Sequence, residues 1–272
     1  MDISWKNIQI ESAGILDQGL KTLYSLNSLS ELSNIPDIAG NYMLFENNKP
    51  IYIGQSQHVP NRIRQHLSSK KFKDREISFT LLPVNLGRKE IEEYGCFYFK
   101  GMENKFHHHR VFDRKDNSLL NWNTIQQDHE EILRNGILQF KNNKAIPWKD
   151  AILSNSPGVY LLYKNTDILY IGEGISLSGR YAMHVGQTRM SVLRRKIATR
   201  KLGFSLKTKQ ELGYDTSKDS KRSFLSNLED VEVSKYLDDC TLKFMEVDFG
   251  RLELESQLIH LFKPELNSKK NN

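Results

Sequence analysis

The chain has 272 residues, of which 38% are hydrophobic and 26% are charged, a composition typical of a folded, water-soluble protein. Its net charge of +6 suits a polyanionic partner without identifying one. No stretch approaches the ~20 apolar residues of a membrane span, and the first residues lack the basic and apolar regions of a secretion signal, so we expect a cytoplasmic protein with no membrane segment. Cys96 and Cys240 form no disulfide or metal-binding pattern.

The first predicted element is a β-hairpin. Residues 42–45 and 51–53 are short apolar and aromatic runs, and the Asn-Asn-Lys-Pro sequence between them is a turn signal. We expect a helix next, on which Arg62 and His66 share one face because they are four residues apart. A third strand is predicted over residues 77–84, followed by a glycine that begins another helix.

Residues 105–146 connect this region to the second half of the chain. They contain three adjacent histidines, His107, His108 and His109, and a helix-like stretch over residues 125–140. Adjacent histidines suggest zinc, but neighbours in sequence rarely converge on one ion, and no cysteine or histidine cluster accompanies them. We therefore expect a surface segment.

The second half repeats the first. The tripeptide Tyr-Ile-Gly occurs at residues 52–54 and 170–172, and a Gly-x-Tyr sequence precedes each copy by the same spacing. The hairpin is predicted again over residues 160–163 and 168–171, and a strand over residues 241–247. The repeat indicates two tandem domains, residues 1–118 with an N-terminal arm and residues 119–272 with a helical connection.

The second copy differs by a long insertion, which we place at residues 186–239. Its first part, residues 186–210, contains eight basic residues and no acidic residue. This composition favours contacts with a nucleic-acid backbone, the alternative being a solvated basic helix face. The predicted nucleic-acid-binding residues are Arg189, Arg194, Arg195, Lys196, Arg200 and Lys201.

The helix after the third strand carries a carboxylate in each copy. Glu255 lies four residues before Ile259 and seven before Phe262, the spacing of a buried stripe, and Glu92 has the same place in the first copy. A carboxylate on an apolar face is costly unless a metal ion or an arginine compensates it. Glu253 shares a face with polar residues, and we expect it to be solvated.

Taken together, these residues resemble the GIY-YIG nuclease domain, and their spacing is most similar to that of the GIY-YIG restriction endonucleases. The resemblance implies a mixed α/β (α+β) fold in which each domain has a small three-stranded antiparallel sheet flanked by helices. It also implies hydrolysis of phosphodiester bonds with one divalent metal ion, Mg²⁺ or Mn²⁺. The residues that match the catalytic pattern are Tyr42, Tyr52, Arg62, His66, Glu92 and Asn104 in the first copy and Tyr160, Tyr170, Arg180, His184, Glu255 and Asn267 in the second.

The roles follow from the resemblance and from the chemistry of each residue type. Glu255 and Glu92 are the expected metal ligands, since Mg²⁺ prefers hard oxygen donors. Arg180 is expected to clamp a phosphate, Tyr160 to act as the general base, and Asn267 to orient the phosphate or a water molecule. We favour the second copy as the active one because it has the basic insertion.

The expected function is therefore a metal-dependent DNA endonuclease with a role in restriction or phage defence, and a companion methyltransferase or another defence protein as a further partner. A structure-selective repair or recombination nuclease is the alternative within the same class. A nucleic-acid-binding protein without catalytic activity is the alternative from another class.

Overall fold

The computed structural model describes residues 3–33, 35–104, 112, 118–214 and 221–267. Contacts between Cα atoms divide the chain into two units. Unit 1 contains residues 1–138 and 248–254, and unit 2 contains residues 139–247 and 255–272. Among the described helices, none combines the length and apolar character needed to cross a membrane.

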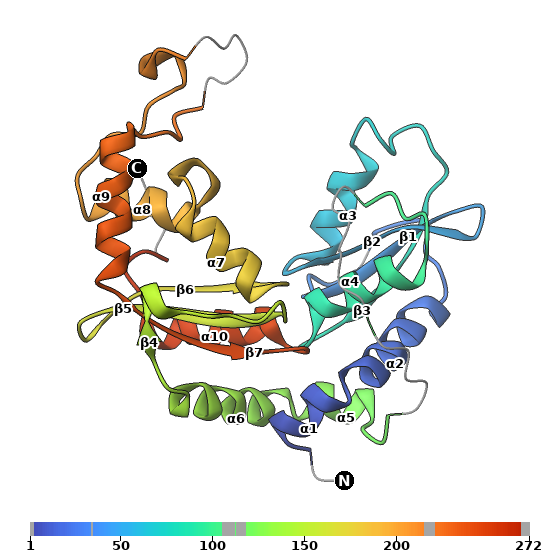
Figure 1. Cartoon of the computed structure of the whole chain (residues 1–272). Coiled ribbons are helices and arrows are strands. Elements are labelled where there is room, and N and C mark those ends of the chain that lie inside the picture. The colour runs from blue at the N-terminus through green and yellow to red at the C-terminus, as the bar shows by residue number, and fades with distance from the viewer. Residues whose placement is uncertain (1–2, 34, 105–111, 113–117, 215–220, 268–272) are drawn as a thin grey trace. The chain divides into compact units, whose positions relative to one another are not determined.

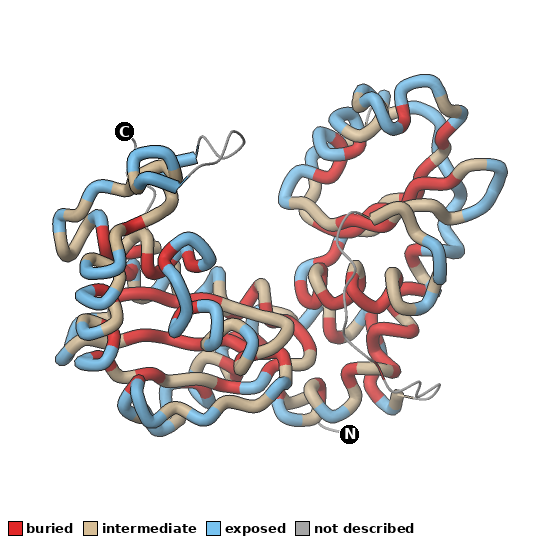
Figure 2. Tube along the Cα trace, turned by 45° about the horizontal axis from the view of Figure 1, so that its top comes forward, coloured by how far each residue is buried: buried red, intermediate tan, exposed pale blue. Residues whose placement is uncertain are grey.

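Unit 1 is built around a three-stranded antiparallel sheet with strand order β2-β1-β3. The strands are β1 (Gly40–Glu46), β2 (Lys49–Ser56) and β3 (Ser78–Pro83). Both central residues of the β1–β2 turn, Asn47 and Asn48, have positive φ, as a tight hairpin turn requires. The central strand β1 is buried along most of its length, since its first six residues are buried (Figure 2).

The helices of unit 1 are, in chain order, α1 (Trp5–Ile10), α2 (Ser12–Ser25), α3 (Val59–Leu67), α4 (Arg88–Tyr98), α5 (Trp122–Gln127) and most of α6 (His129–Asn142). Helices α2 and α4 pack against the sheet and against each other. Helix α3 packs its buried Val59 and Ile63 against the aromatic residues Tyr42, Phe72 and Phe79.

Unit 2 contains a sheet of order β4-β7-β5-β6, in which β5 (Gly158–Lys164) and β6 (Asp167–Gly174) form the hairpin. The third strand predicted for this copy is present as β7 (Thr241–Glu246), which pairs with β5. The two-residue strand β4 (Ile146–Pro147) adds a fourth strand, where the sequence predicted three. This strand pairs at the edge of the sheet, where Pro147 does not interrupt a central ladder.

Three helices of unit 2 lie on one side of its sheet, and their apolar residues share a core with Tyr160 and Leu162. They are α7 (Leu177–Val185), α8 (Val192–Arg200) and α9 (Asn227–Asp238). Figure 1 shows α7 and α10 (Arg251–Phe262) on opposite faces of this sheet. Three short 3-10 turns complete the unit: η1 (Trp148–Asp150), η2 (Thr188–Met190) and η3 (Gln210–Leu212).

The internal repeat is longer than the sequence analysis recognised. Helices α1 and α5 both begin with tryptophan and contain Ile-Gln at the same spacing, and α2 and α6 each have 14 residues. A Cβ atom on Gly136 would lie 2.6 Å from the Trp5 ring, and one on Gly19 would lie 2.7 Å from the Trp122 ring. The same tryptophan–glycine contact therefore occurs twice: the tryptophan of α1 packs against the glycine of α6, and the tryptophan of α5 packs against the glycine of α2.

The helix after the third strand departs from its predicted orientation. The buried residues of α10 are Arg251, Glu253, Leu254 and Leu258, whereas Glu255 is only half-buried. Glu253 is 5% exposed, so the prediction that it is solvated was wrong. Its carboxylate accepts hydrogen bonds from the Gly87 N–H at 3.1 Å and from Arg88 Nε at 2.8 Å.

A matching set of contacts within unit 1 exchanges the roles of the two helices, so that the N-terminal end of α10 donates to carboxylates of α4. The backbone N–H groups of Gly250 and Arg251 both donate to Glu90 at 3.2 Å, and the Arg251 guanidinium donates to Glu93 at 2.5 Å. Each glycine has positive φ and begins a helix, so each helix N-terminus binds a carboxylate from the other helix. Since these charges are buried, removing one partner would leave the other uncompensated.

Candidate active site

The two tyrosines of the second copy lie on neighbouring strands of the hairpin. Tyr160 on β5 is opposite Gly172 on β6 in the strand register. A Cβ atom at Gly172 would lie 2.3 Å from the Tyr160 hydroxyl oxygen, so only glycine leaves room for the phenol at this position. Tyr42 and Gly54 form the same pair in the first copy, where the distance would be 2.4 Å. The glycine of each Tyr-Ile-Gly sequence thus has a steric role.

His184 on α7 meets the first tyrosine of its copy. Its Nε2 atom is 2.7 Å from the Tyr160 hydroxyl, and its Nδ1 atom is 2.6 Å from the hydroxyl of Ser191. The side chain is 3% exposed. Burial, with help from the nearby Arg180 and Arg194, lowers the pKa of His184 to about 3. The imidazole is therefore neutral at physiological pH, so one ring nitrogen donates and the other accepts.

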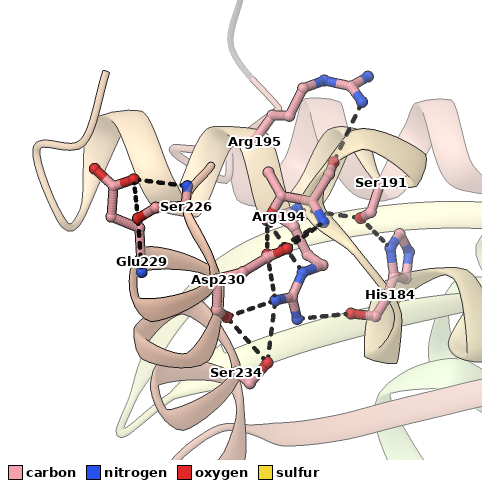
Figure 3. Close-up of polar contacts among 9 residues, drawn as sticks. His184, Ser191, Arg194, Arg195, Ser226, Glu229, Asp230 and Ser234 are labelled. Atoms are coloured by element: carbon pink, nitrogen blue, oxygen red, sulfur yellow. Dashed lines mark hydrogen bonds and ion pairs between the residues drawn. The ribbon is translucent and has the colours of Figure 1, made fainter. Parts of the chain in front are cut away.

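The insertion holds His184 through a polar network, drawn in Figure 3. Ser191 is the N-cap of α8 and accepts the Arg194 N–H at 3.1 Å. The Arg194 guanidinium donates to the His184 carbonyl oxygen at 3.2 Å and to an Asp230 carboxylate oxygen at 2.8 Å. Asp230 and Ser234, which also accepts from Arg194, both lie on α9. Helices α8 and α9 thus fix the position of His184.

This network corrects one prediction. Arg194 was expected to contact a nucleic-acid backbone, but its side chain is 1% exposed. Its three guanidinium nitrogens make five hydrogen bonds, to His184, Thr188, Asp230 and Ser234 inside unit 2. An arginine that is buried and bonded in this way has a structural role, because reaching solvent would leave Asp230 without its charge partner.

Arg180 and Glu255 both lie within electrostatic range of Tyr160. Burial raises the Tyr160 pKa well above its usual value, Arg180 opposes this shift and Glu255 adds to it. The same two groups act on Tyr170, whose pKa burial also raises. Arg180 Nε is buried and has no hydrogen-bond partner among the described residues, so one donor beside Tyr160 remains available.

The first copy repeats this arrangement in a more open form. His66 Nε2 is 2.8 Å from the Tyr42 hydroxyl, and burial lowers the pKa of His66 to about 4. Arg62 is exposed and donates to Gln65 on the same helix at 3.0 Å. Burial, together with the neighbouring charge of Glu93, raises the pKa of Glu92 to about 7. Within the described chain, His66 has no counterpart of the Ser191 contact.

The asparagines have a different place from the one expected. Asn267 Oδ1 accepts the Ile171 N–H, and its Nδ2 donates to the Ile171 carbonyl, both at 2.7 Å. Asn104 bonds both backbone groups of Ile53 in the same way, at 3.3 and 2.7 Å. Each amide therefore ties the segment that follows the helix to the middle of the Tyr-Ile-Gly strand. Its polar atoms are used by the backbone, and it positions the strand.

A basic groove lies on the insertion beside this site. Its volume is about 530 Å³. The charged residues that line it are Arg195, Lys196, Arg200 and Arg222. The ammonium of Lys196 is 5.8 Å from the centre of the Tyr170 ring, so one residue that lines the groove also contacts a candidate catalytic tyrosine. The lining contains no acidic residue.

The other predicted contact residues are divided between surface and packing roles. Arg189 is exposed at η2, whereas Lys201 pairs with the carboxylate of Glu265 and Arg200 donates to the Glu265 carbonyl at 3.0 Å. Sequence reasoning missed Ser191 and Asp230, because a single serine or aspartate in an insertion carries no motif.

The described residues contain no cluster of three or more histidine, cysteine, aspartate or glutamate side chains arranged for a metal ion. Glu92 acts electrostatically on Tyr42, and Glu255 acts on Tyr160. Tyr170 is affected by two carboxylates, Glu255 and Glu173. His107, His108 and His109 lie outside the described residues.

Comparison with protein families gave two matches. A model described as GIY-YIG catalytic domain matches residues 137–272, and another with the same description matches residues 39–134. Together they include every candidate catalytic residue of both copies. The comparison with curated proteins gave no match, and neither did the comparison with solved structures.

Proposed function

The chain belongs to the GIY-YIG nuclease family, and we propose that it is a metal-dependent DNA endonuclease that hydrolyses phosphodiester bonds. The observation that carries this proposal is the hydrogen bond between Tyr160 and the buried, neutral His184, beside an arginine donor that has no partner. The basic groove next to Tyr170 supports a polyanionic substrate.

Tyr160 is the proposed proton acceptor. With its Nδ1–H donating to Ser191, His184 presents an Nε2 lone pair that accepts the Tyr160 O–H. The oxygen lone pairs of Tyr160 then remain available for the proton of an attacking water molecule, while the phenol proton moves toward His184. This relay avoids a free phenolate, which the raised pKa of Tyr160 disfavours.

Arg180 is the proposed phosphate ligand. Its buried Nε donor lacks a partner, and a phosphate oxygen is a suitable acceptor for a guanidinium. An unpaired buried donor is costly, and that cost is relieved when the substrate binds. Arg180 therefore contributes both to binding and to neutralising the charge that develops on the phosphate.

Glu255 and Glu92 would hold Mg²⁺ or Mn²⁺ in the two copies. The donor set fits, because Mg²⁺ is commonly held by one or two carboxylates together with substrate phosphate and water. The raised pKa of Glu92 also fits, since burial and the charge of Glu93 outweigh the nearby Lys89 and Arg62, and a bound divalent cation would favour the charged form. When bound, a divalent ion supplies electrostatic stabilisation of the leaving oxygen.

A role in restriction or phage defence is our first proposal for the biological process, and a companion methyltransferase is the corresponding partner. Cleavage of unmodified plasmid together with protection of the methylated plasmid would support it. Preferential cleavage of branched DNA would favour a repair or recombination nuclease instead. DNA binding with no cleavage of any of these substrates in Mg²⁺ or Mn²⁺ would favour a binding protein.

The direct test uses supercoiled plasmid with and without Mg²⁺, and the variants Glu255→Gln and Glu92→Gln. We expect Glu255→Gln to lose cleavage while it still binds DNA. Nicked product from Glu92→Gln would indicate that both copies cut, and unchanged linear product would indicate that the second copy acts alone. Glu232→Gln, at an exposed position on α9, is the matched control. Cleavage by Glu255→Gln at the wild-type rate would contradict the assignment of the active copy.

A further inference from the structure

A second cavity of the insertion shares one lining residue, Asp230, with the network that holds His184. Its volume is about 450 Å³, within the range of small-molecule and nucleotide sites. It is lined by residues of η2, the 207–214 segment, the 224–225 segment and the start of α9. The lining includes Arg189, Lys209, Tyr214, Phe224, Asn227 and Asp230.

Aromatic and cationic groups meet in this cavity. The Arg189 guanidinium is 6.0 Å from the centre of the Phe224 ring, and the Lys209 ammonium is 5.8 Å from it. Tyr214 contributes a second ring and is 55% exposed, an unusual state for a tyrosine that serves only packing. The cavity thus combines two aromatic rings with two cations. Proteins bind a base by stacking on such rings and its phosphate by such charges.

Polar groups complete the lining. Asn227 is exposed at the first turn of α9, and its amide can donate to and accept from the edge of a base. Asp230 offers a carboxylate, which accepts from exocyclic amino groups. Its Oδ1 also binds Arg194 at 2.8 Å. One carboxylate therefore belongs both to the cavity and to the network that holds His184.

From these contacts we propose that the cavity binds one unstacked nucleobase of the DNA strand that unit 2 cleaves. The inference rests on the proposed endonuclease function and adds a recognition site to it. The base stacks on Tyr214 and Phe224, Arg189 and Lys209 contact its flanking phosphate, and Asn227 and Asp230 read its edge. Asp230 binds Arg194, and Arg194 binds the His184 carbonyl. A base that contacts Asp230 can therefore influence the position of the His184 side chain.

The test measures binding and not cleavage, on the full chain carrying both Glu92→Gln and Glu255→Gln. Two duplexes are compared, one with a single unpaired adenine and one with an abasic linker at the same position. We expect the protein to prefer the unpaired adenine by about tenfold, as one stacked base contributes. Tyr214→Ala should remove this preference, and Leu228→Ala, at an exposed position of α9 outside the cavity, should keep it.

The phosphate contact is tested with a matched pair of charge deletions. Arg189→Ala should weaken binding of the unpaired-adenine duplex more than Lys221→Ala, which removes one charge from an exposed position outside the cavity. Free deoxyadenosine monophosphate, titrated alone, separates a strand-bound base from a free nucleotide. Tight binding of this nucleotide that depends on Tyr214, with no preference between the duplexes, would overturn the proposal in favour of a free-nucleotide site.

Equal affinity for the two duplexes, or a preference that survives Tyr214→Ala, would also overturn it. These outcomes are separate from the failure of the proposed function. A base preference in a protein whose unmodified form cuts no DNA would support the cavity and refute the endonuclease. Metal-dependent cleavage without a base preference would support the endonuclease and refute the base-binding cavity.

Discussion

Acidification is expected to destabilise unit 2 through one residue, His184. The imidazole is buried between Tyr160 and Ser191, and its pKa falls from the ordinary value of 6.5 to about 3. In the unfolded chain the same group titrates near its ordinary value. Between these two pKa values the unfolded state binds more protons than the folded state, so the free energy of unfolding falls as the pH falls.

The size of the effect follows from these two pKa values. At pH 7 nearly all of the contribution of His184 is present. At pH 5 the unfolded state is favoured by protonation about thirtyfold, which lowers the free energy of unfolding by about 2 kcal/mol. The loss continues toward pH 3, where the folded state also takes up the proton.

Native-state hydrogen exchange of peptides from β5 and β6 measures this stability in unit 2, after correction for the intrinsic pH dependence of exchange. His184→Gln should remove about 2 kcal/mol of the difference between pH 7 and pH 5, whatever its effect on stability at pH 7. His260→Gln, at an exposed position on α10, should leave the difference unchanged. The same pH dependence in wild type and His184→Gln would refute a buried neutral histidine.

Three further outcomes follow from the site. Ser191→Ala should reduce cleavage about tenfold and alter its pH profile, because the His184 Nδ1 loses its partner, whereas Ser191→Thr should retain most of the rate; an unchanged profile in Ser191→Ala would argue against the relay. Gly172→Ala should abolish cleavage by displacing the Tyr160 phenol, while Gly203→Ala, which meets no neighbouring atom but has positive φ, should cost only stability; full activity in Gly172→Ala would count against the steric role. Arg195→Ala with Arg200→Ala should reduce the slope of log affinity against log salt by about 0.9 for each lost phosphate contact. The control pair, Arg134→Ala with Lys141→Ala on α6, should leave this slope unchanged. Equal slopes in the two double variants would show that the groove does not contact DNA.

The sequence predicted the parts of the fold whose pattern is local. The hairpins have short apolar, aromatic runs and turn signals, and strands β3 and β7 lie within one residue of the predicted bounds at each end. The short strand β4 was missed because two residues carry no periodicity. The Trp-x-x-Ile-Gln sequences of α1 and α5 did carry a signal, since their spacing continues the repeat that was recognised only from residue 40 onward.

The site was predictable only as a set of residue types. Spacing alone does not say where a side chain hydrogen bonds, so Asn267 was expected to orient the phosphate or a water molecule, whereas its two polar atoms bond the Ile171 backbone. A basic run in sequence does not distinguish an exposed arginine from a buried one. Arg194 is buried against Asp230, and this partner lies 36 residues away, so the local sequence does not reveal the contact. Glu253 was misplaced for the same reason, since its partner Arg88 belongs to the first copy.

The exchanged contacts of unit 1 have a consequence for how such a protein diverges. Gln9 on α1 binds the backbone of Phe249, and Gln126 on α5 binds the backbone of Leu86. Each glutamine therefore contacts the loop of the other copy, and the two contacts are equivalent. Self-complementary pairing of this kind is the pattern of a two-fold homodimer. In a homodimer every substitution appears twice, and an insertion must be tolerated at both positions. Covalent fusion removes that constraint, so one copy has room to acquire residues 186–239 while the other keeps a minimal catalytic domain.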